Sequence, residues 1–545
     1  TDHQSAPPAA RFEWFAYSGA DPVRETITAS ADAYLNPILQ GFYPDPSITQ
    51  VGADYYLVTS TFAYFPGIPV FHSRDLVNWT QLGNAIDRPG MLDFGNLGLS
   101  RGVFAPTIEH HDGVFYIANT CVDCGGNFII RAENPAGPWS DPVWIPQVGG
   151  IDPSLFFDDD GAVYLMNNDG PPGAPQYDGH RAIWIRQIDP QTLQPISEAR
   201  VLIDGGVRFE EKPIWIEGPH IYKHGDYYYL SAAEGGTAEG HSQVILRAHH
   251  PLGPYEAFAG NPILTQRHMD RARPYPITSV GHADFVQTPD GAWWVTFLGV
   301  RPYEGDFYNT GRETFLMPVR WADGWPIITE GAEAVPYTHA RPNLPPQAAP
   351  ALPTHGDFSV REAFDAPLGP HWMRMRAQTT PWLSLGAGAL TLKPRAVSLG
   401  ARADPSFIAR RQQHMNASAE TELRFTPRGQ SEAGLAALQS DEFYFFLAVA
   451  AEGGERVVRL RRRGGDGDPE RGIVIASAPL AGDANAPVRL RISARGPLYD
   501  FAYAVGDGEW ITLARDVDGR ILSTRTAGGF VGAVFGLHAY AGADQ

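Results

Sequence analysis

A pattern that recurs five times in the first two thirds of the chain constrains the fold most. Each copy has a short polar or acidic start, an apolar segment, a turn containing glycine or aspartate, and a second segment rich in aromatic or β-branched residues. Each copy is therefore a β-hairpin signal, and a repeat of this length is typical of a β-propeller. The copies start 60, 47, 65 and 65 residues apart, at Asp45, Ala105, Asp152, Glu217 and His282.

The composition supports a protein that is nearly all β. Aromatic residues make up 12% of the chain, which also has 58 Gly and 47 Pro, and few segments show the helical period. The repeats predict a five-bladed β-propeller over residues 36–335. Residues 1–35 are predicted to form an N-terminal arm that packs on the first sheet of the propeller through its aromatic side chains.

A second domain is predicted after a proline-rich linker. The linker covers residues 336–356, and five of its prolines lie close together, at positions 342, 345, 346, 350 and 353. Residues 357–545 show short alternating segments, which predict an accessory β-sandwich. The segments lie at residues 390–392, 420–425, 444–447, 457–460 and 488–492. The basic run Arg459–Arg463 is interpreted as a solvated strand edge rather than an anion site.

The charge of the chain argues against two classes of partner. With 42 Lys+Arg and 61 Asp+Glu, the net charge of −19 disfavours nucleic acid and anionic membranes, whereas a neutral ligand is not repelled. No run of 18 apolar residues predicts a membrane-spanning helix. No leader-like segment is recognisable at the start, and a secreted or periplasmic location is slightly favoured over a cytoplasmic one. The oligomeric state is not predicted.

Cys121 and Cys124 form a Cys-x-x-Cys sequence before two glycines. A zinc site would need a second pair of ligands, and a thioredoxin-like motif would need a βαβ context. Neither is present in the sequence, so the two cysteines are interpreted as a structural or incidental pair.

Three carboxylates and a histidine occupy four of the five repeat starts. Taken singly, Asp45 and Asp152 each precede a proline and favour a turn, and His282 alone is more often a core histidine than a metal ligand. In a propeller, however, the repeat starts converge on one cavity, where unpaired buried charge is costly. Together with Glu217 they therefore favour a catalytic site. Glycoside hydrolysis needs one protonated carboxyl and one ionised carboxylate, and a third like charge raises the pKa of the acid.

Three segments resemble the acidic motifs of glycoside hydrolase family 43. They are Tyr43–Ser47, Gly150–Phe156 and Ile216–His220, and the segments 60–62, 65–69 and 72–79 resemble the region that follows in its β-xylosidase and α-L-arabinofuranosidase members. The resemblance covers about residues 36–335. The downstream sandwich agrees with the two-domain form of this group.

The resemblance implies an inverting, exo-acting hydrolase that needs no cofactor for its chemistry. Asp45 would be the general base, Glu217 the general acid, and Asp152 the residue that tunes and orients the acid. Arg312 resembles an arginine that reaches the sugar, and His282 matches a histidine that in some members borders a divalent cation such as calcium.

Three phenylalanines are implied to bind substrate. Phe62 would line the sugar subsite, and Phe104 stands where xylosidase relatives usually carry tryptophan. Phe530 lies in a segment that resembles a sandwich loop closing the pocket in two-domain relatives.

Several functional alternatives remain open from the sequence. Within the favoured class, a β-D-xylosidase with α-L-arabinofuranosidase activity is favoured over a mainly arabinofuranosidase enzyme acting on hemicellulose. A retaining enzyme of the invertase type is disfavoured, because its characteristic motifs are absent. A non-catalytic carbohydrate-binding propeller would be expected to lack one of the three carboxylates, and all three are present.

Overall fold

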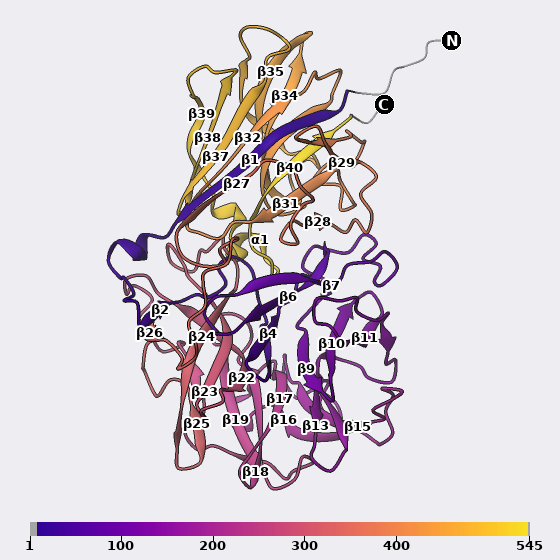
Figure 1. Ribbon diagram of the computed structural model, residues 1–545, viewed down its shortest axis with the longest axis vertical. Coiled ribbons are helices and arrows are strands. Elements are labelled where there is room, and N and C mark those ends of the chain that lie inside the picture. The colour runs from indigo at the N-terminus through magenta and orange to yellow at the C-terminus, as the bar shows by residue number, and fades with distance from the viewer. Residues whose placement is uncertain (1–7, 543–545) are drawn as a thin grey trace.

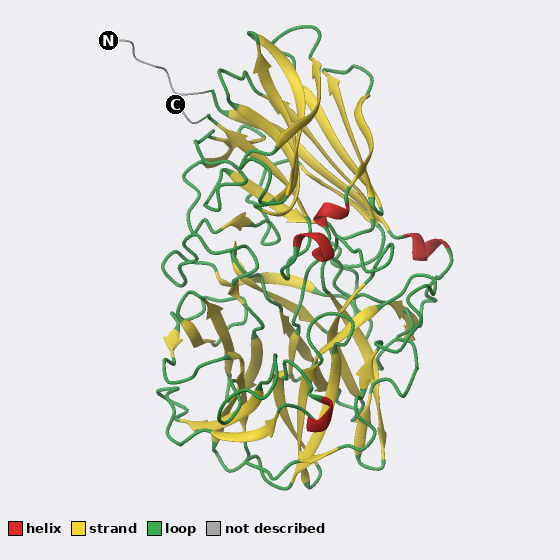
Figure 2. Cartoon of the chain, turned by 180° about the vertical axis from the view of Figure 1, so that it is seen from behind, coloured by secondary structure: helices red, strands yellow, loops and turns green. Residues whose placement is uncertain are grey.

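The computed structural model describes residues 8–542, and these form strands, loops and only four short helical turns (Figure 1). Two parts are stacked along the long axis, and both are built from sheets (Figure 2). The helical turns are η1 (Pro22–Glu25), η2 (Phe209–Glu211), η3 (Arg520–Leu522) and α1 (Thr524–Ala527). Among the described residues, no helix has the length and apolar character needed to cross a membrane.

The first part contains five antiparallel sheets that follow one another along the chain. The first comprises β3 (Ser47–Val51), β4 (Asp54–Val58), β6 (Gly67–Ser73) and β7 (Thr80–Ile86). The second comprises β8 (Gly102–Val103), β9 (Thr107–His111), β10 (Val114–Val122), β11 (Gly126–Ala132) and β12 (Val143–Trp144). The third comprises β13 (Ile151–Phe157), β14 (Val163–Asp169), β15 (Ala182–Ile188) and β16 (Arg200–Asp204).

The fourth and fifth sheets complete this part. The fourth comprises β17 (Glu217–His224), β18 (Tyr227–Glu234), β19 (Ser242–Ala248), β20 (Glu256–Ala257) and β21 (Leu264–Thr265). The fifth comprises β22 (Thr278–Gln287), β23 (Trp293–Val300), β24 (Glu313–Ala322) and β25 (Trp325–Ile327). Each sheet contacts the next, and β22 of the last contacts β3 of the first, so the five sheets close a circle.

All five hairpins predicted from the repeat are confirmed. The paired strands are β3 with β4, β9 with β10, β13 with β14, β17 with β18, and β22 with β23. The alternation of apolar and turn residues therefore sets the registers of the sheets directly.

The starts of four of these hairpins share an unusual backbone conformation. Asp45, Asp152, Gly218 and His282 have φ values of 59°, 56°, 60° and 55°, in the left-handed region. The register of the pairing shifts beside Asp152, Gly218 and His282. Such a bulge re-aims the side chains next to it. In the fourth repeat the left-handed residue is Gly218 and not Glu217, so Glu217 lies one residue before the position equivalent to Asp152.

The second part is a sandwich of two large sheets. One has the order β29-β30-β1-β32-β37-β38-β39, with β27 also paired to β1, and the other has the order β31-β40-β33-β34-β35-β36. The strands of the first sheet are β1 (Ala10–Ala20), β27 (Phe358–Glu362), β29 (Leu383–Gly386), β30 (Ala389–Leu392), β32 (Asn416–Arg424), β37 (Val488–Arg495), β38 (Leu498–Val505) and β39 (Ile511–Asp518). The strands of the second are β31 (Phe407–Arg411), β33 (Glu432–Ser440), β34 (Phe443–Glu452), β35 (Glu455–Gly464), β36 (Ile473–Pro479) and β40 (Val534–Tyr540). All five alternating segments of the sequence lie in or overlap these strands.

The predicted position of the N-terminal arm is wrong. Strand β1 does not pack on the first sheet of the first part; it is an interior strand of the sandwich, paired with β27, β30 and β32, and appears in indigo among the orange strands of Figure 1. Phe12, Phe15 and Tyr17 are buried in the sandwich core. The sandwich is thus assembled from both ends of the chain, and local sequence patterns carry no signal for a pairing over about 400 residues.

The interpretation of the basic run is also wrong. Strand β35 lies between β34 and β36, so Arg459–Arg463 is not at a sheet edge. Arg461 donates through Nε to both carboxylate oxygens of Glu432, at 2.8 and 2.9 Å, and Arg463 is buried with Nη1 2.8 Å from the carbonyl oxygen of Asp441. Arg461 and Arg463 are thus internal hydrogen-bond donors of the sandwich.

Two small sheets pair segments that are far apart in the sequence. Strand β2 (Ala33–Leu35) pairs with β26 (Thr338–Ala340), which lies inside the predicted linker, and residues 341–357 form no regular element. Strand β5 (Tyr64–Phe65) pairs with β28 (Arg374–Met375), which joins the first part to the second. Cys121 and Cys124, interpreted as a structural or incidental pair, form a disulfide at the end of β10.

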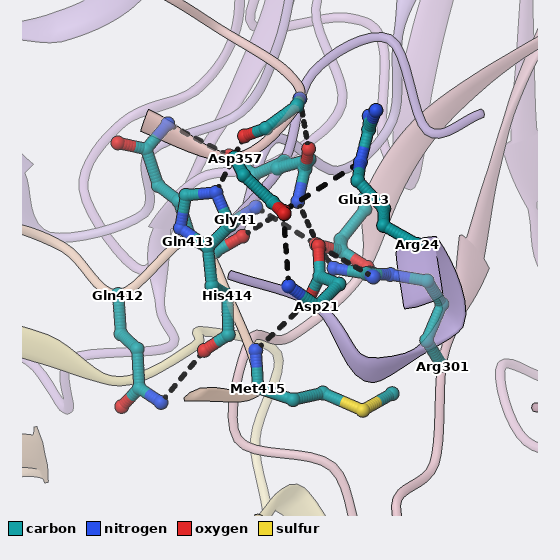
Figure 3. Close-up of polar contacts among 12 residues, drawn as sticks. Asp21, Arg24, Gly41, Arg301, Glu313, Asp357, Gln412, Gln413, His414 and Met415 are labelled. Atoms are coloured by element: carbon teal, nitrogen blue, oxygen red, sulfur yellow. Dashed lines mark hydrogen bonds and ion pairs between the residues drawn. The ribbon is translucent and has the colours of Figure 1, made fainter. Parts of the chain in front are cut away.

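A buried ion group also spans the junction of the two parts (Figure 3). Arg301 donates through Nε to Glu313 at 2.5 Å and through Nη2 to the other oxygen of Glu313 at 2.9 Å, and its Nη1 lies 3.1 Å from Asp21. Asp21 accepts from the backbone N–H of Met415 at 3.0 Å, and Glu313 accepts from that of Gly41 at 2.9 Å. The three charged side chains are at most 2% exposed, so the group is dry and depends on its own pairing.

Candidate active site

One pocket gathers all eight residues that the sequence predicts for the site. They lie in or next to strands of all five sheets and in the loop before β40 of the sandwich. The pocket is lined by Asp45, Phe62, Phe104, Asp152, Glu217, His282, Arg312 and Phe530, together with Ala105, Ile151 and Thr237. The structure therefore brings these residues together, including Phe530, which is 313 residues from Glu217 in the sequence.

Asp45 is a buried carboxylate with positive partners. Ser60 donates to its Oδ2 at 2.6 Å, and Nη1 of Arg312 lies 3.4 Å from its Oδ1. Burial by itself raises the pKa of Asp45, but Arg312, His282 and Ser60 outweigh burial and hold that pKa below its ordinary value. Asp45 is thus ionised at neutral pH.

Glu217 and Asp152 form the opposite electrostatic environment. Burial and the negative charge of Asp45 raise the pKa of Glu217 to about 7. Burial, Glu217 and Asp45 likewise raise the pKa of Asp152, although the backbone N–H of Gly218 donates to its Oδ2 at 2.9 Å. Like charges in a dry pocket cannot all ionise, so this pair retains a proton near neutral pH.

Arg312 lies between the carboxylates and the aromatic wall. Its side chain is only 8% exposed, and its guanidinium lies 5.2 Å from the ring centroid of Phe530. Its Nε is buried without a hydrogen-bond partner among the described residues. A pocket-lining donor left unpaired in this way is available to a ligand hydroxyl.

Three phenylalanines form the apolar wall of the pocket. The rings of Phe62 and Phe530 are stacked with centroids 5.9 Å apart, and Phe104 meets each of them edge-on at 5.7 Å. Phe62 has a φ of 57°, and its backbone exchanges hydrogen bonds with Val103, next to Phe104. The cluster couples the sandwich to the pocket through ring contacts.

The loop that carries Asp45 is held by the sandwich. Arg411 donates through Nε to the carbonyl oxygen of Phe42 at 2.7 Å, and its guanidinium lies 4.0 Å from the ring centroid of Tyr43. Gly41 has a φ of 88°, and an added Cβ would lie 3.2 Å from Cβ of Arg411. Only glycine fits this approach, so the positions of the sandwich and of the Asp45 loop are coupled.

His282 lines the pocket as a buried side chain whose Nδ1 lies 4.0 Å from Asp45. Burial lowers its pKa, so the imidazole is neutral near neutral pH. A Cβ at Gly218 would lie 2.9 Å from its ring, so the glycine makes room for it.

The donor set around His282 fits calcium only in part. Calcium prefers six to eight oxygen ligands, whereas the nearest carboxylate, Asp45, is already engaged by Arg312 and Ser60. Within residues 8–542, the cluster of potential metal ligands is Asp21, Asp357 and His414, none of which lines the pocket. That cluster belongs to the network of Figure 3, where Arg301 and Arg24 supply positive charge.

Sequence reasoning assigned no role to three residues near the carboxylates. Ser60 lies in the segment 60–62 that resembles family 43, and its hydroxyl donates to Asp45. Thr237 lines the pocket from the loop after β18. His241 is buried, and burial lowers its pKa to about 4. Only Ser60 was accessible to sequence reasoning, because no repeat position marks the other two.

The arrangement can perform acid–base chemistry on a neutral ligand. It holds one carboxylate that stays ionised and a pair that keeps a proton, all lining the same pocket. An unpaired arginine N–H and an aromatic wall complete it. Environments that separate the pKa values of neighbouring carboxyls are the mark of an acid and a base.

Comparisons with known proteins agree across the whole chain. The model for "Glycosyl hydrolases family 43" matches residues 34–326, and that for "Beta xylosidase C-terminal Concanavalin A-like domain" matches residues 361–545. The chain is 37% identical to a non-reducing end alpha-L-arabinofuranosidase of Bacteroides ovatus, over 94% of this chain and 92% of that protein. It is 35% identical to a xylosidase/arabinosidase of Butyrivibrio fibrisolvens, over 92% and 95%. A GH43_12 crystal structure retrieved from capybara gut metagenome superposes with a TM-score of 0.91 at 38% identity, covering 98% of this chain and all of that one.

The raised pKa of Glu217 predicts that the folded protein is less stable above pH 7 than at pH 4.5. Its pKa of about 7 in the folded state exceeds its ordinary value of 4.5, so the folded protein loses stability as the pH rises from 4.5 through 7. The loss amounts to roughly 3 kcal/mol above that range. Glu217→Gln removes it, and we expect a higher Tm than wild type at pH 8 and an equal Tm at pH 4.5, measured by thermal unfolding.

Glu210→Gln is the matched control, because Glu210 is exposed in η2 of the preceding loop. This control should leave the Tm unchanged at both pH values. If the Glu217→Gln protein were no more stable than wild type at pH 8, the predicted destabilisation by ionised Glu217 would be wrong.

Proposed function

Since this chain belongs to glycoside hydrolase family 43, we propose that it releases single pentoses from xylo-oligosaccharides or arabinoxylan. It is a glycoside hydrolase, and β-D-xylosidase activity accompanied by α-L-arabinofuranosidase activity agrees with the names of its relatives. The observation that supports this best is the single pocket in which Asp45 is ionised while Glu217 and Asp152 retain a proton.

We propose that the five closed sheets are the blades of a five-bladed β-propeller, with the pocket on its axis. Support comes from the hairpin repeat and from the contact between the last sheet and the first. We further propose residues 36–335 as the catalytic domain, 336–356 as the linker and 357–545 as the accessory sandwich. Strand β1 completes that sandwich.

In the proposed mechanism, Asp45 is the general base. Arg312 and Ser60 keep it ionised, so it can take a proton from a water molecule that attacks the anomeric carbon. Both partners act on the charge of the base, because one is a cation and the other is a hydroxyl donor.

Glu217 is the general acid in this mechanism. A pKa of about 7 keeps a large share of it protonated up to neutral pH, so it can donate to the leaving glycosidic oxygen. Asp152 tunes and orients Glu217. Asp152 raises the proton affinity of the pair and accepts the backbone N–H of Gly218, directly after Glu217.

The aromatic wall supports exo action. Phe530 of the sandwich stacks on Phe62 and contacts Arg312, which caps one side of the pocket. The apolar face of a pentose can lie on Phe62 and Phe104 while its hydroxyls receive hydrogen bonds from Arg312. A capped pocket admits one terminal sugar rather than the interior of a chain.

The chemistry needs no cofactor. We propose that a divalent cation such as calcium has only a structural role beside His282, with water as most of its ligands, because this histidine offers a single neutral nitrogen and hard cations prefer oxygen. The substrate is a neutral oligosaccharide, consistent with the acidic charge of the chain.

Removal of the acid should separate catalysis from binding. We expect Glu217→Ala to lower kcat on xylobiose by about 10²–10⁴-fold, the usual contribution of a general acid, while KM changes little. An aryl xyloside with a good leaving group needs little protonation, so its rate should be partly retained. Kinetics on both substrates give the test.

Full activity of Glu217→Ala on xylobiose would disprove the assignment of the acid. A wild-type protein that binds xylobiose without hydrolysing it would favour the carbohydrate-binding alternative. Glu210→Ala again serves as control.

The stereochemistry should be inverting. With Asp45 activating water rather than attacking the sugar, the first sugar released from a β-xyloside should be α-xylose. Proton NMR within the first minutes of reaction distinguishes the anomers. Release of β-xylose first would support the retaining alternative.

The shape of the pocket walls decides which pentose is preferred. A β-D-xyloside and an α-L-arabinofuranoside can present their scissile bonds and hydroxyls in similar positions, so one pocket can accept both. We expect kcat/KM on p-nitrophenyl β-D-xyloside to exceed that on the α-L-arabinofuranoside, with both measurable. The reverse order would make this a mainly α-L-arabinofuranosidase enzyme, the second candidate, which the B. ovatus relative favours.

A further inference from the structure

A second aromatic feature lies beside Glu217, outside the residues that line the pocket. Trp215 is 40% exposed and Ile214 is 38% exposed, although most large apolar side chains of the protein are buried. Both immediately precede strand β17, which begins at Glu217. Exposed aromatic side chains next to a site are candidates for ligand contact.

Three loops hold this position at the same edge of the sheets as the carboxylates. They follow β14, β16 and β18 and span residues 170–181, 205–216 and 235–241. The backbone N–H of Trp215 donates to the carbonyl oxygen of Gly179 at 2.9 Å, and that of Gly235 donates to Ile214 at 2.9 Å. The third loop also carries Thr237, which lines the pocket. The backbone of Ile214 and Trp215 is therefore held between the two neighbouring loops, one of which lines the pocket.

The backbone of Trp215 is strained. Its φ is 49°, in the left-handed region, where a bulky residue costs about 1 kcal/mol or more. A strained backbone that presents an indole to solvent is not explained by packing. Burial would normally offset such strain, and here the ring remains 40% exposed.

Arg181 completes the feature. Its guanidinium lies 4.9 Å from the ring centroid of Trp215, and its Nε and Nη2 donate to Oδ1 of Asn168 at 3.1 and 2.7 Å. Asn168 in turn donates to the carbonyl oxygen of Ile216 at 2.6 Å, directly before Glu217. Within residues 8–542, Nη1 of Arg181 makes no hydrogen bond, so it can donate to a hydroxyl.

The position of the leaving group indicates which part of the substrate lies near Trp215. Under the proposed function, Glu217 protonates the oxygen that leaves with the rest of the substrate. The sugar unit bearing that oxygen therefore lies on the Glu217 side, beyond the pocket that holds the terminal pentose. A pyranose ring offers an apolar face for an indole and hydroxyls for an arginine.

We propose that Trp215 and Arg181 form the binding site for the leaving-group sugar, a neutral pyranose unit of the chain from which the pentose is cut. Trp215 stacks on the apolar face of this pyranose, and Nη1 of Arg181 donates to one of its hydroxyls. The proposal rests on the proposed function and extends it. It names the residues that bind the rest of the substrate chain, next to the pocket that holds the terminal pentose.

The test compares substrates with and without a leaving-group sugar. Xylobiose places a pyranose on Trp215, whereas β-D-xylosyl fluoride leaves only fluoride and makes no contact there. We expect Trp215→Ala to lower kcat/KM on xylobiose by about tenfold, the size expected for one lost stacking contact, and to change kcat/KM on the fluoride by less than about twofold. Trp215→Phe should fall between Trp215→Ala and wild type on xylobiose.

Ile214→Ala is the matched control, since Ile214 is the neighbouring residue with nearly the same exposure. It should leave both substrates unaffected. Equal losses on both substrates for Trp215→Ala, or a selective loss for Ile214→Ala, would show that the loop is merely structural and overturn the proposal. An unchanged rate of Trp215→Ala on xylobiose would also overturn it. Failure of the proposed function is distinguishable, because wild type would then hydrolyse neither xylobiose nor the corresponding arabinofuranosyl-oligosaccharide.

Discussion

The buried guanidinium of Arg301 is the interaction on which the junction of the two parts depends. It pairs with Glu313 from β24 and with Asp21 from the segment that follows β1, and all three side chains are almost completely buried. Removing one partner of such a group leaves an uncompensated charge, which typically costs 3–5 kcal/mol. The group therefore specifies one docking of sandwich on sheets, because any other arrangement would leave Arg301 or a carboxylate unpaired in a dry environment.

That docking shapes the active site directly. Glu313 is the residue after Arg312 and also accepts the N–H of Gly41, at the start of the loop that leads to Asp45. Arg411 of the sandwich holds the same loop at Phe42, and Phe530 stacks on the pocket wall. The site thus lies at the interface of the two parts. The sandwich supplies part of the site, so it is not an independent attachment to the first part. A buried apolar cluster also spans the junction, so apolar packing joins the two parts as well.

Much of this was accessible from sequence because it is local or repeated. The hairpins follow from alternation and turn residues, and Asp45 and Asp152 from a shared position before proline. Glu217 was also found as a repeat start, although it lies one residue before the equivalent position, where Gly218 takes the left-handed backbone. The place of β1 was not accessible, since its partners lie hundreds of residues away and Phe12 or Tyr17 would suit either sheet. The buried roles of Arg461 and Arg301 were also missed, because a charge carries no sequence signal for the partner that allows its burial.

The distribution of charge around the pocket explains why three carboxylates are tolerated there. Arg312 is a single cation against Asp45, Asp152 and Glu217, so full ionisation would leave two uncompensated negative charges in a buried pocket. Arg312 lies 3.4 Å from Asp45, and its stabilisation is therefore concentrated on that residue. The remaining pair lowers its energy by keeping a proton, because Arg312 and, more weakly, Arg181 do not outweigh burial and the charge of Asp45 at Glu217. The same imbalance that makes the pocket costly to fold thus leaves the ionised carboxylate beside Arg312 and the proton on the Glu217–Asp152 pair.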